Sequence, residues 1–161
     1  MCFMKTFTKF FVAFNVALLV SCGSAKVDYS YEHRCIGTGK QGLQIVEVFS
    51  YGKTVEQAIN ASKRNAVHAV LFKGLNCPSG SQPALAGAAD AEKHKAYFEE
   101  FFRSGKYLQF VTLSGDGSID PSKRMKIDKG YKVGVDIAIR YNALRDKLEA
   151  DGIIRKMNAG F

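Results

Sequence analysis

The chain has 161 residues, 47% of them hydrophobic, and carries a formal net charge of +8 at pH 7. This length supports one domain around a single hydrophobic core and excludes an architecture of several domains. A strong positive charge often accompanies nucleic-acid binding, but no basic motif interleaved with aromatic residues occurs, so we expect no nucleic-acid partner.

An export signal is predicted over residues 1–21. Lys5 and Lys9 precede an apolar run over residues 10–20, and a small residue, Ser21, follows that run. The run is about 11 residues long, too short for a transmembrane helix, which needs about 20 apolar residues. A basic start, a short apolar run and a small residue are typical of a secretory signal, so we exclude residues 1–21 from the fold.

Cys22 stands directly after this run, in the sequence Leu19-Val20-Ser21-Cys22. That sequence resembles a bacterial lipobox, which implies cleavage before Cys22 and acylation of its thiol, for example with palmitate. Each buried methylene contributes about 0.8 kcal/mol, so a cap of several chains would anchor the protein stably. Because no acidic run follows Cys22, we expect an outer membrane lipoprotein that faces the periplasm. The alternative is a secretory signal cut after a small residue such as Ala25, which would leave a soluble periplasmic protein.

The mature chain of 140 residues remains basic. Residues 1–21 contain two lysines and no acidic residue, so the net charge falls to +6 when they are removed. A basic surface attracts anionic groups, and we expect an envelope protein or an anionic glycan as a partner besides the membrane. The alternative is a solvated basic surface without a partner.

The first regular elements follow a lead-in. Residues 22–41 are polar and contain several glycines, which predicts a lipidated tether and an irregular lead-in. Leu43–Tyr51 is rich in β-branched and aromatic residues, which predicts a strand. Thr54, with Gln57 three residues later, matches a capping box, and apolar residues at helical spacing predict a helix that stops at Gly74.

The middle of the chain predicts a loop over Asn76–Ala89, because that segment contains two prolines and many small residues. A second helix is predicted over Asp90–Phe102 and a strand over Lys106–Ser114, followed by a turn at residues 115–122. Strict alternation then predicts a long strand over Tyr131–Tyr141, with one face on the core and the other in water.

Asn142 caps a last predicted helix, which ends at Gly152. The element order is therefore β-α-α-β-β-α. The two strands joined by residues 115–122 are expected to form a hairpin, and the first strand to pair alongside it. We predict an α+β fold: a two-layer sandwich in which helices cover one face of a small antiparallel or mixed sheet, within a single domain over residues 42–161.

Cys35 and Cys77 are the cysteines that remain when Cys22 carries lipid. Two thiols in an oxidising compartment favour a disulfide, which would close a loop of about 40 residues and contribute about 4 kcal/mol. The alternative is two free thiols, which would allow a small periplasmic hydrolase or thiol-redox protein that uses either cysteine with His94. The two cysteines with His33 and His94 have the residue types of a zinc site. They lack the short cysteine spacings of a structural zinc site, however, so no metal ligand is predicted.

No motif predicts a cofactor. Gly37–Gly42 spells G-x-G-x-x-G, but it precedes a strand, whereas a dinucleotide-binding loop follows a strand and opens a helix. No constellation of catalytic residues stands out elsewhere, which favours a non-enzymatic binding or assembly domain over an enzyme.

Two basic surfaces are candidate binding sites. Lys63 and Arg64 fall on the outward side of the first predicted helix, and Lys132 and Arg140 fall on the exposed side of the long strand. We expect one of these surfaces to contact the envelope partner.

A further hypothesis is a glycan- or lipid-binding module. It requires a pocket lined by Phe98 and Phe101, with the loop Asn76–Ala89 as a lid. A filled core around these rings would argue against it.

Several segments carry a resemblance to a known family. The sequence is similar to a family of uncharacterised Bacteroidetes lipoproteins over Val46–Lys53, Ala61–Gly74, Tyr131–Val135 and Leu144–Ile154, and in its closing Gly160-Phe161. More distantly, the first strand and helix resemble LPP20-type lipoproteins and the N-terminal domain of flagellar assembly proteins. These resemblances imply an envelope-assembly accessory with no assigned activity.

Overall fold

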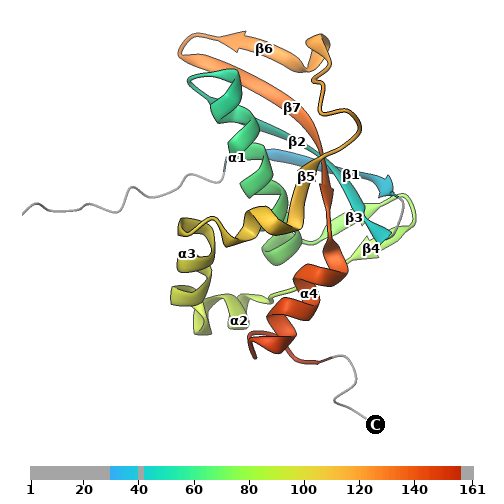
Figure 1. The fold of residues 1–161 in the computed structure, drawn as a ribbon, viewed down its shortest axis with the longest axis vertical. Helices are drawn as coiled ribbons and strands as arrows, with labels where there is room; N and C mark the ends of the chain where they lie inside the picture. Colours follow the sequence, from blue (N-terminus) through green and yellow to red (C-terminus); the bar gives the residue numbers. More distant parts are fainter. Residues whose placement is uncertain (1–29, 40–41, 157–161) are drawn as a thin grey trace, which may run out of the picture.

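The computed structural model describes residues 30–39 and 42–156. Within them an antiparallel sheet is covered on one face by helices, which confirms the predicted α+β fold (Figure 1). The export signal, Cys22 and half of the predicted tether and lead-in lie outside the described residues.

The main sheet has the order β1-β2-β7-β5, and β6 pairs beside the other half of β7. Every pairing is antiparallel. The strands are β1 (Glu32–Thr38), β2 (Gln44–Gly52), β5 (Val111–Leu113), β6 (Arg124–Ile127) and β7 (Gly130–Ile139). The long alternating segment is thus the central strand, because β7 has a neighbour on both edges.

Alternation along β7 separates the two faces of the sheet. Val133, Val135, Ile137 and Ile139 are buried beneath the helices. Along a strand, successive side chains point to opposite faces. Lys132 and Asp136 therefore lie on the face that no helix covers.

The first helix, α1 (Val55–His68), lies across the covered face of β2 and β7 (Figure 1). Thr54 Oγ1 accepts a hydrogen bond from Gln57 N at 3.2 Å, as the capping pattern predicts. The helix continues as a π-helical turn (Ala69–Lys73) and stops at Gly74, whose φ of 74° lies in the left-handed region.

The remaining helices gather at one end of the sheet (Figure 1). The second predicted helix is two helices, α2 (Ala88–Lys93) and α3 (Lys95–Arg103), which meet at His94. After β7, α4 (Tyr141–Ala150) buries Leu144 and Leu148 completely.

Three segments differ from the sequence-based expectation. Residues 32–38, predicted as part of a tether, form β1, because Cys35 packs into the core and the strand pairs with β2. The expected loop Asn76–Ala89 contains most of a small hairpin, β3 (Leu75–Cys77) with β4 (Gly80–Gln82). The strand predicted over Lys106–Ser114 is a 3-10 helix (Lys106–Phe110) followed by the short β5.

The spacing of aromatic residues explains the 3-10 helix. Tyr107 and Phe110 are three residues apart, which places them on one side of such a helix. The Tyr107 ring lies 5.5 Å from that of Phe102, and the Phe110 ring lies 6.1 Å from that of Phe101. These contacts with α3 override the β propensity of the segment.

The predicted antiparallel pairing with the long strand is confirmed for Val111–Leu113, but a further strand lies between the two in the chain. Residues 124–127 form β6, which makes a tight hairpin with β7, while β5 pairs with the far end of β7. All four residues of β6 are exposed, and the strand is only four residues long, so its alternation of basic and apolar residues is too short to predict a strand. None of the helices in residues 30–39 and 42–156 is long and apolar enough to cross a membrane.

Candidate functional site

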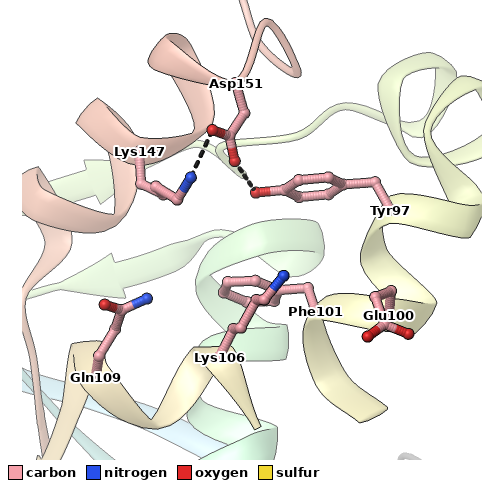
Figure 2. A pocket seen from close by; sticks show the side chains of 7 residues that line it. All are labelled: Tyr97, Glu100, Phe101, Lys106, Gln109, Lys147 and Asp151. Atoms are coloured by element: carbon pink, nitrogen blue, oxygen red, sulfur yellow. Dashed lines mark hydrogen bonds and ion pairs between the residues drawn. The ribbon is translucent and has the colours of Figure 1, made fainter. Parts of the chain in front are cut away.

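A surface cleft opens between α3, the 3-10 helix and α4 (Figure 2). Its volume of about 310 Å³ is at the lower end of the range for small-molecule sites. Two aromatic rings, two lysines, two carboxylates and an amide line it: Tyr97, Glu100, Phe101, Lys106, Gln109, Lys147 and Asp151.

Aromatic rings form one wall of the cleft. Tyr97 and Phe101 are four residues apart on α3, so they share one face of the helix. Their ring planes are 13° apart, with centroids separated by 6.1 Å. Phe101 is only 2% exposed, and its ring stacks on Phe110 from the core side. The wall is therefore a rigid apolar surface.

A hydrogen-bonded trio links α3 to α4 beside this wall (Figure 2). The Tyr97 hydroxyl donates to Asp151 Oδ2 at 2.6 Å, and Lys147 Nζ donates to Asp151 Oδ1 at 2.5 Å. Burial, with the hydrogen bond and charge of Asp151, raises the pKa of Tyr97 well above its usual value. The bonds from Lys147 and Tyr97 lower the pKa of Asp151. Tyr97 therefore stays protonated and Asp151 ionised at neutral pH.

Lys106 and Gln109 supply the uncommitted polar groups of the cleft. Within the described part of the chain, Lys106 makes no ion pair and the Gln109 amide makes no side-chain hydrogen bond. Glu100 is already paired with Arg103. In the view of Figure 2 the side chain of Lys106 crosses in front of Phe101 and points toward the side of the cleft where Tyr97 and Asp151 lie. This arrangement suits a ligand that has a flat apolar face and an anionic group.

Phe98 and Phe101 do not line a common pocket. Both rings are buried, and Phe98 forms part of a separate shallow groove with Phe72 and Phe102. The β3–β4 hairpin, in the segment expected to form a lid, lies beside β1 and away from the cleft (Figure 1). Phe98 and Phe101 therefore do not form the pocket that the glycan or lipid hypothesis requires. Phe101 instead lines the cleft together with Tyr97.

Lys63 and Arg64 lie on α1, but neither is fully exposed. The Arg64 Nε is buried. Burial raises the pKa of Tyr107 against the opposing charge of Arg64, and the same charge adds to the burial that lowers the pKa of His68. Arg64 thus packs toward neighbouring rings, and Lys63 is half-buried on the same helix. The pair is less outward-facing than the helical pattern predicted.

Lys132 and Arg140 do not form one surface. Lys132 Nζ donates to Glu32 Oε1 at 2.7 Å and lies over the rings of Phe49 and Tyr51. Arg140 is exposed beyond the opposite end of β7, where it precedes α4. The length of β7 separates the two cations.

Glu47 is a buried acid on the open face of the sheet that the sequence analysis missed. It lies opposite Asp136 in the register of β2 and β7, where two carboxylates would repel. Lys123 Nζ bridges them, 2.7 Å from Glu47 Oε1 and 3.1 Å from Asp136 Oδ1, and Arg34 Nη2 is 2.6 Å from Glu47 Oε2.

The balance of charges in this network explains the ionisation of Glu47. Burial by itself raises the pKa of Glu47, but the hydrogen bonds and charges of Lys123 and Arg34 outweigh it and lower the pKa. With Asp136 the four groups carry two positive and two negative charges, so the network neutralises itself. It is a structural element of the sheet.

The structure joins Cys35 on β1 to Cys77 on β3 by a disulfide. A bridged sulfur is not a thiolate nucleophile. His94 lies between α2 and α3, which are far from β1 and β3 in the fold (Figure 1). His33, on β1, is hydrogen-bonded to the backbone of Gly74 and lies near the charge of Lys73. These residues therefore do not converge, and no cluster of three metal-ligating side chains occurs among the described residues.

A half-buried histidine gives the domain a pH-dependent contact. The Tyr31 hydroxyl and His68 Nδ1 are hydrogen-bonded at 2.8 Å. Burial lowers the pKa of His68 to about 4, helped by the charges of Lys73 and Arg64. Between pH 6.5 and 4 the unfolded chain thus binds a proton at this site that the folded chain does not, and stability rises with pH.

As the pH falls from 6.5 to 4, we expect the titration of His68 to lower the free energy of unfolding by about 1–2 kcal/mol. This value allows for the screening of a half-buried group by solvent. His68→Gln removes the titrating group and should flatten the curve over that interval. Urea titrations at several pH values measure the difference. Parallel curves for the wild-type protein and the variant would show that His68 keeps an ordinary pKa.

The comparisons with known proteins find no relative. No family model, no curated protein and no solved structure matches the chain.

Of the residues that line the cleft, only Phe101 belonged to a predicted site, the pocket of the glycan or lipid hypothesis. Lys106 and Gln109 were assigned to a strand. The available signal was the four-residue spacing of Tyr97 and Phe101 beside Lys147 and Asp151, also four residues apart. Nothing in the sequence indicated that α3 and α4 would face each other.

Proposed function

We propose that this chain is a non-enzymatic lipoprotein of the cell envelope, whose α+β domain is a binding or assembly accessory module anchored through acylated Cys22. The observation that carries the proposal is the Cys35–Cys77 disulfide in a chain that has Leu19-Val20-Ser21-Cys22 at the end of its signal. Disulfides persist in the compartment to which such a signal leads. The resemblance to Bacteroidetes lipoproteins supports the same proposal.

The described chemistry supports binding over catalysis. The bridged cysteines and the distant His94 offer no nucleophile and base within reach of one another. The cleft combines a rigid aromatic wall with Lys106 and Gln109, which is the composition of a recognition site.

The anchor is tested by metabolic labelling with palmitate and by fractionation of the envelope. We expect the wild-type protein to incorporate palmitate and to remain with the outer membrane after washing with high salt. Cys22→Ala should abolish labelling, because the acylated thiol is absent. Cys2→Ala, in the signal, is the matched control and should label normally. Labelling that persists in Cys22→Ala would refute the anchor.

A second candidate function is the binding of an acidic glycan in the cleft. The half-buried ring of Tyr97, supported by the buried ring of Phe101, offers an apolar surface to a sugar, and Lys106 offers a counter-ion to a carboxylate. A hydrogen bond to a charged group contributes about 1.5–3 kcal/mol.

Co-sedimentation with purified peptidoglycan sacculi tests this second function. Lys106→Glu should weaken binding at least tenfold, because the cation at the cleft becomes an anion. Lys93→Glu makes the same charge change at an exposed position on α2 and should leave the affinity unchanged. Equal losses in the two variants would assign the binding to overall charge.

A further inference from the structure

The hairpin of β6 and β7 extends beyond the helical layer at the end of the sheet opposite α4 (Figure 1). All four residues of β6 are exposed, and Met125 and Ile127 are each 41% exposed. Met125 lies opposite Lys132, which in turn lies opposite Tyr51, itself 44% exposed. Three large apolar or aromatic side chains therefore share the uncovered face at this end of the sheet.

Unpaired cations lie on the other side of β6 and in the turn of the hairpin. Arg124, Lys126 and Lys129 make no ion pair with any residue of the described ranges, whereas Lys132 is paired with Glu32. Arg124 and Lys126 alternate with Met125 and Ile127 along β6, so the strand has one apolar side and one basic side. This pattern is typical of a segment that lies at a membrane interface.

The position of Glu32 at the start of β1 limits the distance of Cys22 from this hairpin. Glu32 begins β1, lies opposite Phe49, and accepts a hydrogen bond from Lys132 Nζ at 2.7 Å. The chain therefore enters the sheet at the end where β7 begins. Ten peptide units separate Cys22 from Glu32, and they span at most about 36 Å.

That length is enough to bring the hairpin to the bilayer. Phe49 pairs with Glu32 on one side and with Gly134 on the other, so Glu32 and Gly134 lie at the same level of the sheet. β7 begins four residues before Gly134, and the hairpin tip therefore lies about 14 Å beyond Glu32. The segment from Cys22 to Glu32 is therefore long enough to reach past the hairpin tip.

We infer that the β6–β7 hairpin, with Tyr51, docks onto the surface of an anionic lipid bilayer. The inference rests on the proposed anchor, which supplies the nearby membrane. Met125, Ile127 and Tyr51 enter the interface, where the amphipathic ring of tyrosine is favoured. The long side chains of Arg124, Lys126 and Lys129 reach the lipid phosphates. The cleft at the other end of the molecule then faces away from the membrane.

The test uses the lipidated protein, reconstituted into vesicles of phosphatidylethanolamine and phosphatidylglycerol. Ile127→Cys carries an environment-sensitive fluorophore, and Leu108→Cys, at a 49% exposed position on the 3-10 helix, is the control. We expect a shift to shorter wavelength and quenching by a lipid-borne quencher at position 127 only. Equal, water-like emission at both positions would overturn the inference.

Removal of the charges gives a second readout. Arg124→Gln/Lys126→Gln/Lys129→Gln should lower the ratio of docked to undocked protein about a hundredfold, because each basic residue near an anionic surface contributes roughly fivefold. The control, Lys93→Gln/Arg155→Gln/Lys156→Gln, changes the net charge equally at exposed positions elsewhere and should dock normally. Docking that is equally strong on phosphatidylcholine vesicles would also overturn the inference.

Acylation of Cys22 is measured separately from docking of the hairpin. Flotation with the vesicles and the palmitate content report acylation, whatever the state of the hairpin. If the protein proves unacylated, the same labelled variants are titrated with vesicles. The inference then requires weak binding through position 127 that the hairpin triple variant loses and the control keeps.

Discussion

Removal of the Cys35–Cys77 bridge is expected to lower the free energy of unfolding by about 4 kcal/mol. The cysteines are 42 residues apart, and a crosslink over a loop of this length restricts the unfolded chain by about that amount. The bridge also joins β1 to the β3–β4 hairpin, which has only three residues in each strand. Cys35→Ala/Cys77→Ala, followed by urea denaturation under oxidising conditions, measures the loss.

The single variants serve as controls for the bridge. Cys35→Ala and Cys77→Ala should each lose nearly as much stability as the double variant, because either substitution opens the loop. Reductant should destabilise the wild-type protein and leave the double variant unchanged. A double variant within 1 kcal/mol of the wild-type protein would mean that the crosslink contributes little.

Replacement of Gly130 by alanine is expected to destabilise the domain by about 3–4 kcal/mol. Gly130 has a φ of 153°, a conformation that other residues rarely adopt. A Cβ at this position would lie 2.2 Å from the carbonyl oxygen of Gly52, so the backbone of β2 would have to move. Backbone strain and overpacking each cost about 1–3 kcal/mol.

Gly87→Ala is the matched control for Gly130→Ala. Gly87 has a φ of −66°, and a Cβ there would meet no atom within 4 Å. We expect its stability to stay within about 0.5 kcal/mol of the wild-type value. Circular dichroism during urea denaturation compares the two variants, and equal stabilities would show that β2 and β7 separate easily at this end.

The sequence was informative where a local pattern determines structure. Alternation over Tyr131–Tyr141 identified β7, and the Thr54 pattern identified the start of α1, because a strand face and a helix cap each depend on nearby residues. The fold class follows from these elements, since an amphipathic strand and helix bury their apolar faces against each other.

The errors have a common physical cause. β1 has few apolar residues and β6 is only four residues long, and each forms because it pairs with a neighbouring strand of the sheet. The cleft depends on the approach of α3 to α4, fixed by contacts such as the hydrogen bond of Tyr97 to Asp151, 54 residues away. The buried Glu47 is explained only by the positions of Arg34 and Lys123, which come from other elements.

The most direct test of the account is the intact mass of the protein extracted from the bacterial envelope. The account predicts a chain that begins at Cys22, carries diacylglyceryl and acyl groups, and is two mass units lighter than its reduced form because of the Cys35–Cys77 bridge. A chain without lipid that begins at another residue, for example after Ala25, would contradict the anchored accessory that we propose.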